Sequence, residues 1–435
     1  MTASQYRPVA KAMLDFIEQS PTPWHAVAST CARLQQAGFT RLLETDSWQL
    51  QTHGRYFVTR QDASVIAFIV GEKTEQHGLR IIGAHTDSPG MRVKTSGAQE
   101  NGGYLRLNCE VYGGPILATF TDRDLALAGR LLIRDSTSKD GVRSMLYNST
   151  RAVVRMPNLP IHLNRNVNDD GLKVHKHRDL NLLLSALQQA LPARDAFSHW
   201  LCQEPGIDRS DLLGFELLPY DAQPGAFFGV DDEFIAVRQL DNLASCHAAL
   251  EALLNSKAGK ATQMIALFDH EEVGSTSYTG ADGSFLQDVI ERICAIESTA
   301  RDSYRRSLAN SWLLSADMAH AWHPSHNDCY DGLHHLKVNQ GVALKINSSQ
   351  RYATDGYGEA LFTQLAEKAS VPSQKYVHRA DLSCGSTIGP LSASRIGIRT
   401  LDVGVPMWAM HSARESGGAD DQFHYVKFME AFLQH

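Results

Sequence analysis

The stretch IALFDHEEVGS, Ile265 to Ser275, joins a short apolar run to a cluster of acidic residues. An apolar run of this length that ends near a glycine is typical of a buried β-strand. Side chains alternate between the two faces of a strand, so the adjacent Glu271 and Glu272 cannot both point the same way within one. We therefore expect both glutamates where the strand ends and the chain turns, at the rim of a sheet.

That rim has a chemical meaning, because open α/β sheets bind their ligands at the ends of their strands. Burying two carboxylates is costly unless cations balance their charge. Glu271 and Glu272 therefore suggest a metal ligand next to a general base. The alternative interpretation is a charged, solvated loop that follows an edge strand.

The composition is that of a globular protein without a strong charge bias. The chain has 435 residues, 43% of them hydrophobic, and a formal net charge of -7. This length suggests two or three domains, and the charge gives no basic footprint for nucleic acid. The seven cysteines include no CxxC pair, which disfavours a disulfide framework. No signal peptide or membrane span is indicated, so we expect a cytoplasmic protein without nucleic-acid or membrane partners.

Two patterns divide the chain. Strands alternate with helices in residues 1–90 and 235–435, which predicts an α/β layer fold. Residues 91–234 instead show short alternating runs, which are typical of half-buried strands. We therefore expect a discontinuous α/β domain, with a mixed sheet flanked by helices, interrupted by a β-rich insertion.

The expected elements follow from the apolar runs and their spacing. In the α/β part, we expect helices over 9–17, 285–296, 358–368 and 422–433, and strands over 65–70, 79–84, 265–268, 312–316, 342–346 and 396–403. In the insertion, we expect strand-like segments over 116–120, 125–128 and 131–133, turns at Gly113-Gly114 and Gly129, an exposed loop over 164–179, and no alternation of helices with strands.

Potential metal ligands follow several of these strands, and all of them fall in the α/β part. They are His85, Asp87, Asp241, Glu271, Glu272, Asp317 and His411. Each has a structural explanation when taken alone; Asp241, for example, precedes a helix, where Asp is a common N-cap. Taken together, they lie where a doubly wound sheet holds its site.

Such a set of side chains suits a pair of divalent ions. Histidines and carboxylates give mixed nitrogen and oxygen ligation, which is compatible with zinc and also with manganese or cobalt. Two-metal hydrolases acidify a water that becomes the nucleophile. A nearby carboxylate that binds no metal then takes its proton and delivers it to the leaving amine.

Six motifs stand in the order seen in the aspartyl aminopeptidases, a group of co-catalytic two-zinc aminopeptidases: GAHTDSPG, QLDNLAS, DHEEVGS, SADMAHAWHP, LKINSSQRYAT and MHSARESGG. The chain resembles this family over nearly its whole length. The resemblance implies removal of N-terminal Asp or Glu from peptides. It also implies a dimerisation role for the inserted domain and assembly of dimers into a dodecamer.

The resemblance also implies roles for the individual residues. His85 and Asp317 would bind one metal, Glu272 and His411 would bind the other, and Asp241 would bridge the two. Glu271 would be the general base. Asp87 would orient His85, a common support for a ligating histidine.

Substrate-binding residues are implied in the same way. Lys345 matches a substrate-binding lysine of the family, and a cation there would pair with the acidic side chain of the substrate. Tyr352 matches a substrate-binding tyrosine, and Arg351 is an alternative cation. His162, within the insertion, matches a histidine that reaches the active site of the neighbouring subunit. The backbone N–H groups of Gly385, Ser386 and Thr387 could also hold a substrate carboxylate.

Two other readings of the sequence stay open. The chain could be a non-catalytic assembly protein that keeps only the fold, or a metallohydrolase for neutral N-terminal residues or N-acyl amino acids. A serine hydrolase is disfavoured, because the sequence lacks GxSxG and Ser386 is out of register for that turn.

Overall fold

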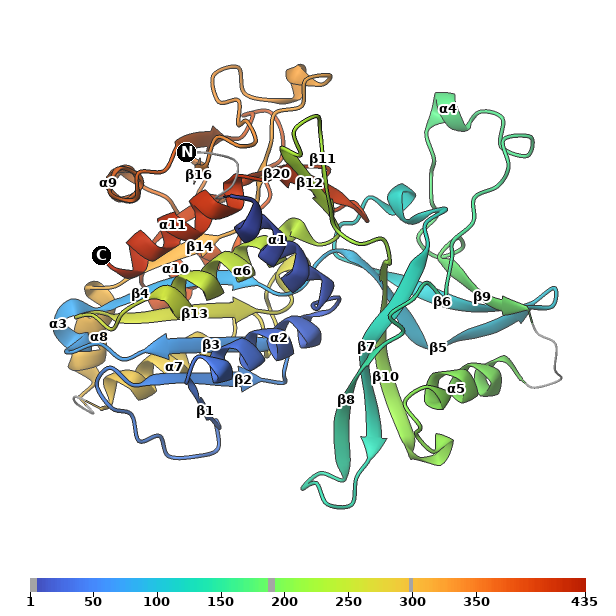
Figure 1. Cartoon of the computed structure of the whole chain (residues 1–435), viewed down its shortest axis with the longest axis horizontal. Coiled ribbons are helices and arrows are strands. Elements are labelled where there is room, and N and C mark those ends of the chain that lie inside the picture. The colour runs from blue at the N-terminus through green and yellow to red at the C-terminus, as the bar shows by residue number, and fades with distance from the viewer. Residues whose placement is uncertain (1–5, 187–191, 297–299) are drawn as a thin grey trace. The chain divides into compact units, whose positions relative to one another are not determined.

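The computed structural model describes residues 6–186, 192–296 and 300–435, and the chain forms two compact units (Figure 1). The first unit contains the chain up to Asp87, Gly225–Met410 and Glu415–His435, and the second contains Ser88–Pro224 and His411–Arg414. The chain returns to the first unit at Gly225, earlier than the boundary at residue 234 that we expected from the sequence. The reason is that β11 and β12 join a sheet of the first unit, in the order β11-β12-β20-β19-β15. These strands span Ala226–Phe228, Phe234–Val237, Glu415–Gly418, Pro406–Trp408 and Ala319–His320.

A nine-stranded mixed sheet forms the centre of the first unit, in the order β1-β2-β3-β13-β4-β14-β18-β16-β17. The four strands β13, β4, β14 and β18 are parallel neighbours, whereas β3 and β16 run antiparallel to them. The predicted fold class, a mixed sheet flanked by helices, is confirmed. The strands span Thr40–Leu42 (β1), Arg55–Arg60 (β2), Ser64–Ile69 (β3), Thr262–Phe268 (β13), Leu79–His85 (β4), Trp312–Ala316 (β14), Arg399–Gly404 (β18), Val342–Ile346 (β16) and Ser373–Val377 (β17).

Helices cover both faces of this sheet, which explains why its inner strands are apolar on both sides. Every residue of β13 is buried. Ile265 and Leu267 pack with one set of helices, whereas Met264 and Phe268 pack with the other. The first set, which lies over the sheet in Figure 1, includes α1 (Arg7–Glu18), α2 (Pro23–Gln36), α6 (Leu240–Asn255), α9 (Gly356–Ala369) and α11 (Asp421–Leu433). The second set is α7 (Phe285–Cys294), α8 (Arg301–Ala309) and α10 (Ile388–Ile396).

The second unit is built from two three-stranded antiparallel sheets, β10-β7-β8 and β5-β6-β9, around their own apolar core. Its sheet elements are β5 (Gly90–Asn101), β6 (Tyr104–Tyr112), β7 (Leu125–Arg134), β8 (Val142–Asn148), β9 (Asn181–Ala186) and β10 (Leu212–Asp221). The short helix α4 (Val167–Asp170) lies in the loop that the sequence predicted to be exposed.

Three details of the second unit differ from the sequence prediction. Helix α5 (Ala193–Gln203), which buries Phe197 and Leu201, was not predicted. The segment expected as a strand at 116–120 forms a 3-10 helix, Leu117–Phe120. Gly129 continues β7 rather than turning the chain. A Cβ at Gly129 would lie 1.8 Å from the Glu216 carbonyl oxygen, so this glycine permits close approach of β10.

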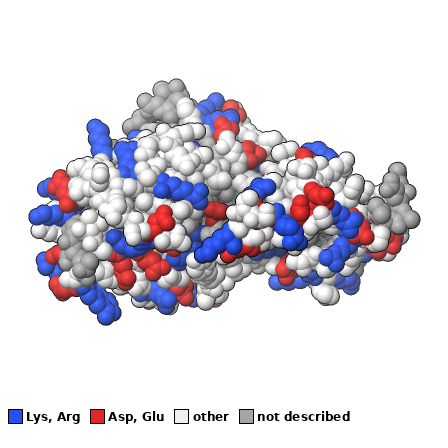
Figure 2. All heavy atoms as spheres, turned by 90° about the horizontal axis from the view of Figure 1, so that it is seen from below, with Lys and Arg blue, Asp and Glu red and all other residues white. Residues whose placement is uncertain are grey.

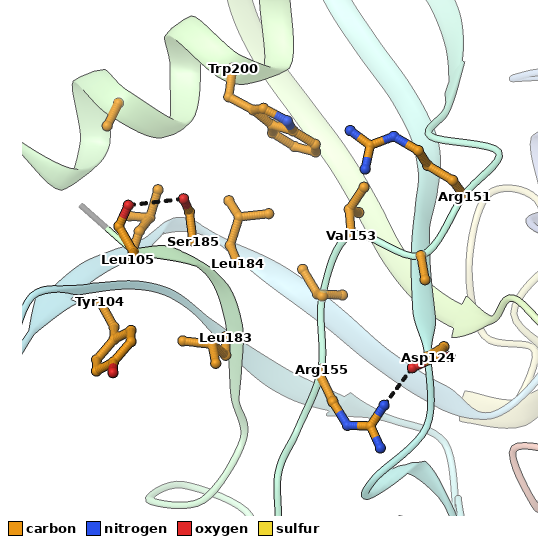
Figure 3. A pocket seen from close by; sticks show the side chains of 14 residues that line it. Tyr104, Leu105, Asp124, Arg151, Val153, Arg155, Leu183, Leu184, Ser185 and Trp200 are labelled. Carbon is orange, nitrogen blue, oxygen red and sulfur yellow. Dashed lines mark hydrogen bonds and ion pairs between the residues drawn. The ribbon is translucent and has the colours of Figure 1, made fainter. Parts of the chain in front are cut away.

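An open pocket of about 620 Å³ lies within the second unit (Figure 3). Val153, Leu184 and Trp200 give it an apolar side, and an ion pair between Arg155 and Asp124 borders it. Among the described residues that line it, none is a predicted metal ligand.

Two expectations from composition can be compared with the described part of the chain. On the face shown in Figure 2, Lys and Arg are interspersed with Asp and Glu. None of the helices in the described ranges has both the length and the apolar character that a membrane span needs.

Candidate metal centre

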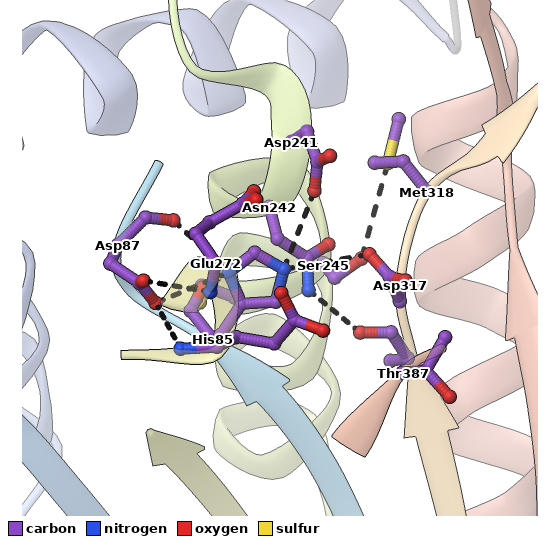
Figure 4. A network of polar contacts seen from close by, with 12 residues as sticks. His85, Asp87, Asp241, Asn242, Ser245, Glu272, Asp317, Met318 and Thr387 are labelled. Atoms are coloured by element: carbon purple, nitrogen blue, oxygen red, sulfur yellow. Dashed lines mark hydrogen bonds and ion pairs between the residues drawn. The ribbon is translucent and has the colours of Figure 1, made fainter. Parts of the chain in front are cut away.

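Three neighbouring parallel strands end at one edge of the central sheet, and each delivers predicted site residues there (Figure 4). His85 is the last residue of β4 and lies in register with Phe268, the last residue of β13. Glu271 and Glu272 begin the 3-10 turn that follows β13. Asp317 directly follows β14. The strand order β13-β4-β14 therefore brings these side chains to one place, as ligands collect at the carboxyl ends of parallel strands.

Asp241 reaches the same place from the start of α6. Its backbone is not helical, with φ -79° and ψ 105°, and neither is that of Asn242, so the regular part of α6 begins after these two residues. Its backbone N–H donates to Glu415 Oε2 at 3.1 Å. The next residue, Asn242, donates from its side chain to the Ala316 carbonyl at 2.8 Å. These contacts tie the tip of α6 to β20 and β14.

The side chains at this edge are close enough to share ions. His85 Nε2 lies 3.4 Å from Asp241 Oδ1 and 3.5 Å from Asp317 Oδ1. Potential ligand atoms of His85, Asp241 and Asp317 all lie within 4.8 Å of one another, as do those of His85, Glu271 and Glu272. His85 is 2% exposed and Asp241 is 3% exposed.

The charges of this cluster fit a bound cation. Burial raises the pKa of Glu271 to about 8, and neighbouring carboxylates such as Asp317 contribute to the rise. Burial also raises the pKa of Glu272 well above its ordinary value, with Asp241 contributing. Burial alone would lower the pKa of His85, but hydrogen bonds to carboxylates outweigh it and raise that pKa well above 6.5. Without metal, protons must therefore balance the crowded acids, and divalent ions would replace them.

Asp87 connects the two strand ends that carry the cluster. Its carboxylate accepts the backbone N–H groups of Glu271 and Glu272, both at 3.1 Å. His85 Nδ1 lies 3.0 Å from the Asp87 carbonyl oxygen and 3.4 Å from the Asp87 carboxylate. Asp87 is 1% exposed. One buried carboxylate therefore contacts both the histidine and the turn that carries the glutamate pair.

A buried cation borders the cluster. Lys345, on β16, is 1% exposed. Its Nζ donates to Asp317 Oδ2 and to the Met318 carbonyl, both at 3.1 Å. The ring centroid of Tyr352, which is 4% exposed, lies 5.1 Å from the same Nζ. The predicted substrate lysine and tyrosine therefore lie next to each other, one contact away from Asp317.

The two remaining predicted site residues belong to the second unit. His411 is the first residue of its short segment His411–Arg414, and its Nδ1 lies 3.1 Å from the Gly114 carbonyl oxygen. His162 lies exposed in the loop before α4. The role of His411 as a metal ligand and that of His162 at a neighbouring subunit stay predictions.

Two supporting residues were not singled out from the sequence. Glu415, in the motif MHSARESGG, holds the backbone of Asp241 as described above. Cys246, on α6, lies with its Sγ 2.9 Å from the His85 carbonyl oxygen. The motif that contains Glu415 could have pointed to this residue. Cys246 could be recognised from the sequence only as part of an apolar helix face.

Comparisons with known proteins identify the family. The model of a family described as aminopeptidase I zinc metalloprotease (M18) matches residues 16–433. A protein named probable M18 family aminopeptidase 2 from Pseudomonas aeruginosa (strain LESB58) is 44% identical over 423 residues, which cover 97% of this chain and 96% of that protein. A protein of the same name from Stutzerimonas stutzeri (strain A1501) is 44% identical over 424 residues, with the same coverage.

Solved structures show the same fold. A structure described as "Cryo-EM structure of the Ape4 and Nbr1 complex" has a TM-score of 0.93 and 35% identity, and the match covers 99% of this chain and 86% of that chain. One described as "Structure of S. cerevesiae mApe1 dodecamer" has a TM-score of 0.86 and 28% identity, with 99% and 97% coverage. The chain therefore belongs to the aminopeptidase I zinc metalloprotease (M18) family, metallo-aminopeptidases that remove N-terminal residues from peptides.

Proposed function

We propose that this metallo-aminopeptidase is of the aspartyl type and removes N-terminal Asp or Glu from peptides. The observation that carries the proposal is the buried Lys345 next to the acidic cluster. A lysine ammonium has three N–H donors. Asp317 and the Met318 carbonyl accept two of them, and no other acceptor among the described residues takes the third. That donor is free for the carboxylate of an acidic substrate side chain, and its burial strengthens such a bond.

The metals of this proposal are two divalent ions per subunit, zinc in the first instance, with manganese or cobalt as alternatives. We assign His85 and Asp317 to one ion, Glu272 and His411 to the other, and Asp241 to the bridging position. Supporting the assignment are the close approach of His85 to Asp241 and Asp317 and the mixed nitrogen and oxygen donors.

Glu271 is the general base in this scheme. When bound, the ions acidify a water and polarise the scissile carbonyl. Glu271 takes the proton from the attacking water and passes it to the leaving amine. Asp87 fixes this turn through the backbone N–H groups of Glu271 and Glu272, so the base stays aimed at one position. Lys345 holds the substrate side chain while Tyr352 packs against the lysine.

Assembly completes the proposal. We assign the second unit to dimerisation and expect dimers to form a dodecamer, as the yeast relative is described. In support, three apolar side chains lie close to His162 in the sequence and are exposed: Leu159 and Ile161 before it and Leu163 after it are 64%, 46% and 74% exposed. Contact with a second copy would cover them and would carry His162 to the neighbouring active site.

The test of acidic specificity is Lys345→Met, assayed on matched Asp, Glu, Ala and Leu aminoacyl substrates. We expect kcat/KM for Asp and Glu to fall by about 10- to 100-fold, the range for losing a hydrogen bond to a charged group. Neutral substrates should change little. Lys375→Met, on the exposed side of β17, is the matched control.

Metal content measured on the same samples shows whether a loss of activity comes from lost substrate recognition or from lost metal binding at Asp317. Lys345→Arg, which keeps the charge, should retain part of the acidic preference. Equal loss on acidic and neutral substrates with metals retained, or a wild-type preference for neutral residues, would contradict the proposal.

A further inference from the structure

A second polar pocket lies beside the proposed substrate residues, in the first unit. It has a volume of about 470 Å³ and is formed by two loops that follow the ends of β16 and β17. These strands are parallel, with Ile346 in register with Val377, so both loops leave the same edge of the sheet. Of the described residues that line it, only Arg351 was considered from the sequence, as an alternative cation for the substrate side chain.

The lining of this pocket is cationic. Arg351 and Arg379 contribute to it, and the described residues that line it include no acid. His378 also lines the pocket, but burial lowers its pKa, so its imidazole adds no positive charge at neutral pH. Arg379 is balanced by Asp381, because the two form an ion pair at 2.7 Å. Arg351 is exposed and forms no ion pair with any described residue; its Nε donates to the Cys384 carbonyl at 3.1 Å. The pocket therefore carries an unbalanced guanidinium.

Direct contacts connect this pocket to the catalytic cluster. Cys384 lines the pocket, and burial together with contact to the Cys384 thiol raises the pKa of Tyr352. The Tyr352 ring lies 5.1 Å from Lys345 Nζ, which in turn donates to Asp317 at 3.1 Å. Arg351 Nε donates to the Cys384 carbonyl, so contacts through Cys384, Tyr352 and Lys345 lead from this pocket to Asp317.

We propose that this pocket is an anion subsite that binds the terminal carboxylate of short peptide substrates through Arg351. The inference rests on the proposed exopeptidase site, in which the N-terminal residue is held at the metals and the rest of the peptide leads away. A guanidinium binds a carboxylate through two parallel hydrogen bonds, which gives direction as well as affinity. Hydroxyl and amide groups of Ser348, Ser383 and Asn347 line the same pocket and add hydrogen-bonding capacity for a carboxylate that stays hydrated.

The test uses pairs of peptides that differ only at the C-terminus: Asp-Ala and Asp-Ala-Ala with a free carboxylate, and the same peptides as C-terminal amides. For the wild type, we expect a lower KM for at least one free acid than for its amide. In Arg351→Gln, the KM of that free acid should rise about tenfold, the low end for losing a hydrogen bond to a charged group at an exposed site. The kcat for the free acid and the KM for its amide should stay nearly unchanged. Arg351→Lys should recover part of the KM difference between acid and amide, because lysine keeps the positive charge but cannot form the two parallel hydrogen bonds of a guanidinium.

Arg301→Gln, an exposed arginine on α8, is the matched control and should leave every pair unchanged. Equal KM values for acids and amides in the wild type would overturn the subsite, as would an equal loss on both in Arg351→Gln. If Arg351→Gln also raised the KM for an Asp-anilide, which has no terminal carboxylate, Arg351 would instead bind the N-terminal Asp of the substrate. That result would also overturn the subsite. If neutral N-terminal residues prove to be preferred, the same pairs made with that residue test the subsite independently of the acidic specificity.

Discussion

Glu271 and Glu272 are adjacent in the chain, yet the proposed chemistry gives them different tasks. The turn after β13 makes this division workable, because the two backbone N–H groups share one acceptor, the Asp87 carboxylate. Both glutamates lie half-buried among other acids, so metal ions and protons compete for the same oxygens. Removing the charge of one glutamate should therefore separate hydrolysis from metal binding.

Glu271→Gln is the prediction at this scale. The amide cannot accept the proton of the attacking water, so hydrolysis should fall by about 10²- to 10⁴-fold, the usual contribution of a general base. Metal content should stay at the wild-type value, because the assigned ligands are intact. Glu291→Gln, an exposed acid on α7, serves as the control and should keep full activity. Full activity in Glu271→Gln would contradict its assignment as the base.

Single residues also show where prediction from sequence stops. Asp317 and His85 were predictable as candidates because each follows an apolar run that reads as a strand. Cys246 and Asp87 were harder. The contact of Cys246 with the His85 carbonyl depends on how α6 packs against β4, and the contact of Asp87 with both glutamate N–H groups depends on the pairing of β4 with β13. No local pattern encodes a contact between segments so far apart in the chain.

Among the elements, buried strands with uniform apolar sequence were predicted most closely. The expected ranges 312–316 and 342–346 coincide with β14 and β16. Strand β13 begins earlier than expected, at Thr262, because its first residues are polar but buried; the Gln263 side chain donates to the Lys257 and Leu433 carbonyls. Gly129 was misread as a turn because its reason, the approach of β10, is a tertiary one.

Helix α11 begins with a buried acid whose titration gives a prediction at the scale of elements. Asp421 is 1% exposed and accepts the backbone N–H groups of Asn339 and Gly341 at 2.6 and 2.8 Å. Burial raises its pKa to about 7, and the neighbouring Asp420 adds to the rise. The folded protein therefore holds a proton that the unfolded chain releases near its ordinary pKa of 3.8. The stability linked to this proton is full below that value and is lost as the pH rises through about 7.

Asp421→Asn should remove this pH dependence. The amide loses one acceptor and lowers the melting temperature at pH 5, but the deficit relative to the wild type should shrink as the pH rises from 5 to 8. The linked free energy is on the order of a few kcal/mol, because one pKa unit corresponds to about 1.4 kcal/mol. Differential scanning fluorimetry across this range measures the change, with Asp302→Asn, an exposed acid on α8, as control. A constant deficit from pH 5 to 8 would contradict the raised pKa.

At the scale of the whole molecule, the chain divides its tasks between two units. The first carries the acids and His85 at one sheet edge, and the second carries His162 and His411 on separate segments. The hydrophobic pattern of the sequence alone predicted the change from alternating helices and strands to a β-rich segment. Assembly leaves no such local pattern, and only the resemblance to a family indicated it.

Leu163→Asp is the prediction for assembly. A charge at this exposed apolar position should be costly to bury against a second copy, so the variant should shift from the dodecamer toward smaller species. Size-exclusion chromatography with light scattering measures the shift. Leu333→Asp, a leucine that is 89% exposed in the first unit, is the control and should not change the mass. An unchanged dodecamer in Leu163→Asp, or a wild type that is a monomer, would contradict the proposed role of this loop.

The most direct test of the metal centre is the metal content of protein purified without chelators, measured by plasma mass spectrometry on the wild type and on Asp241→Ala. The account predicts two divalent ions per chain in the wild type. It predicts the loss of at least one ion, together with activity, in the variant, because Asp241 is assigned to the bridging position between the ions. A wild type without bound divalent metal, or an Asp241→Ala variant that keeps both ions, would contradict the account.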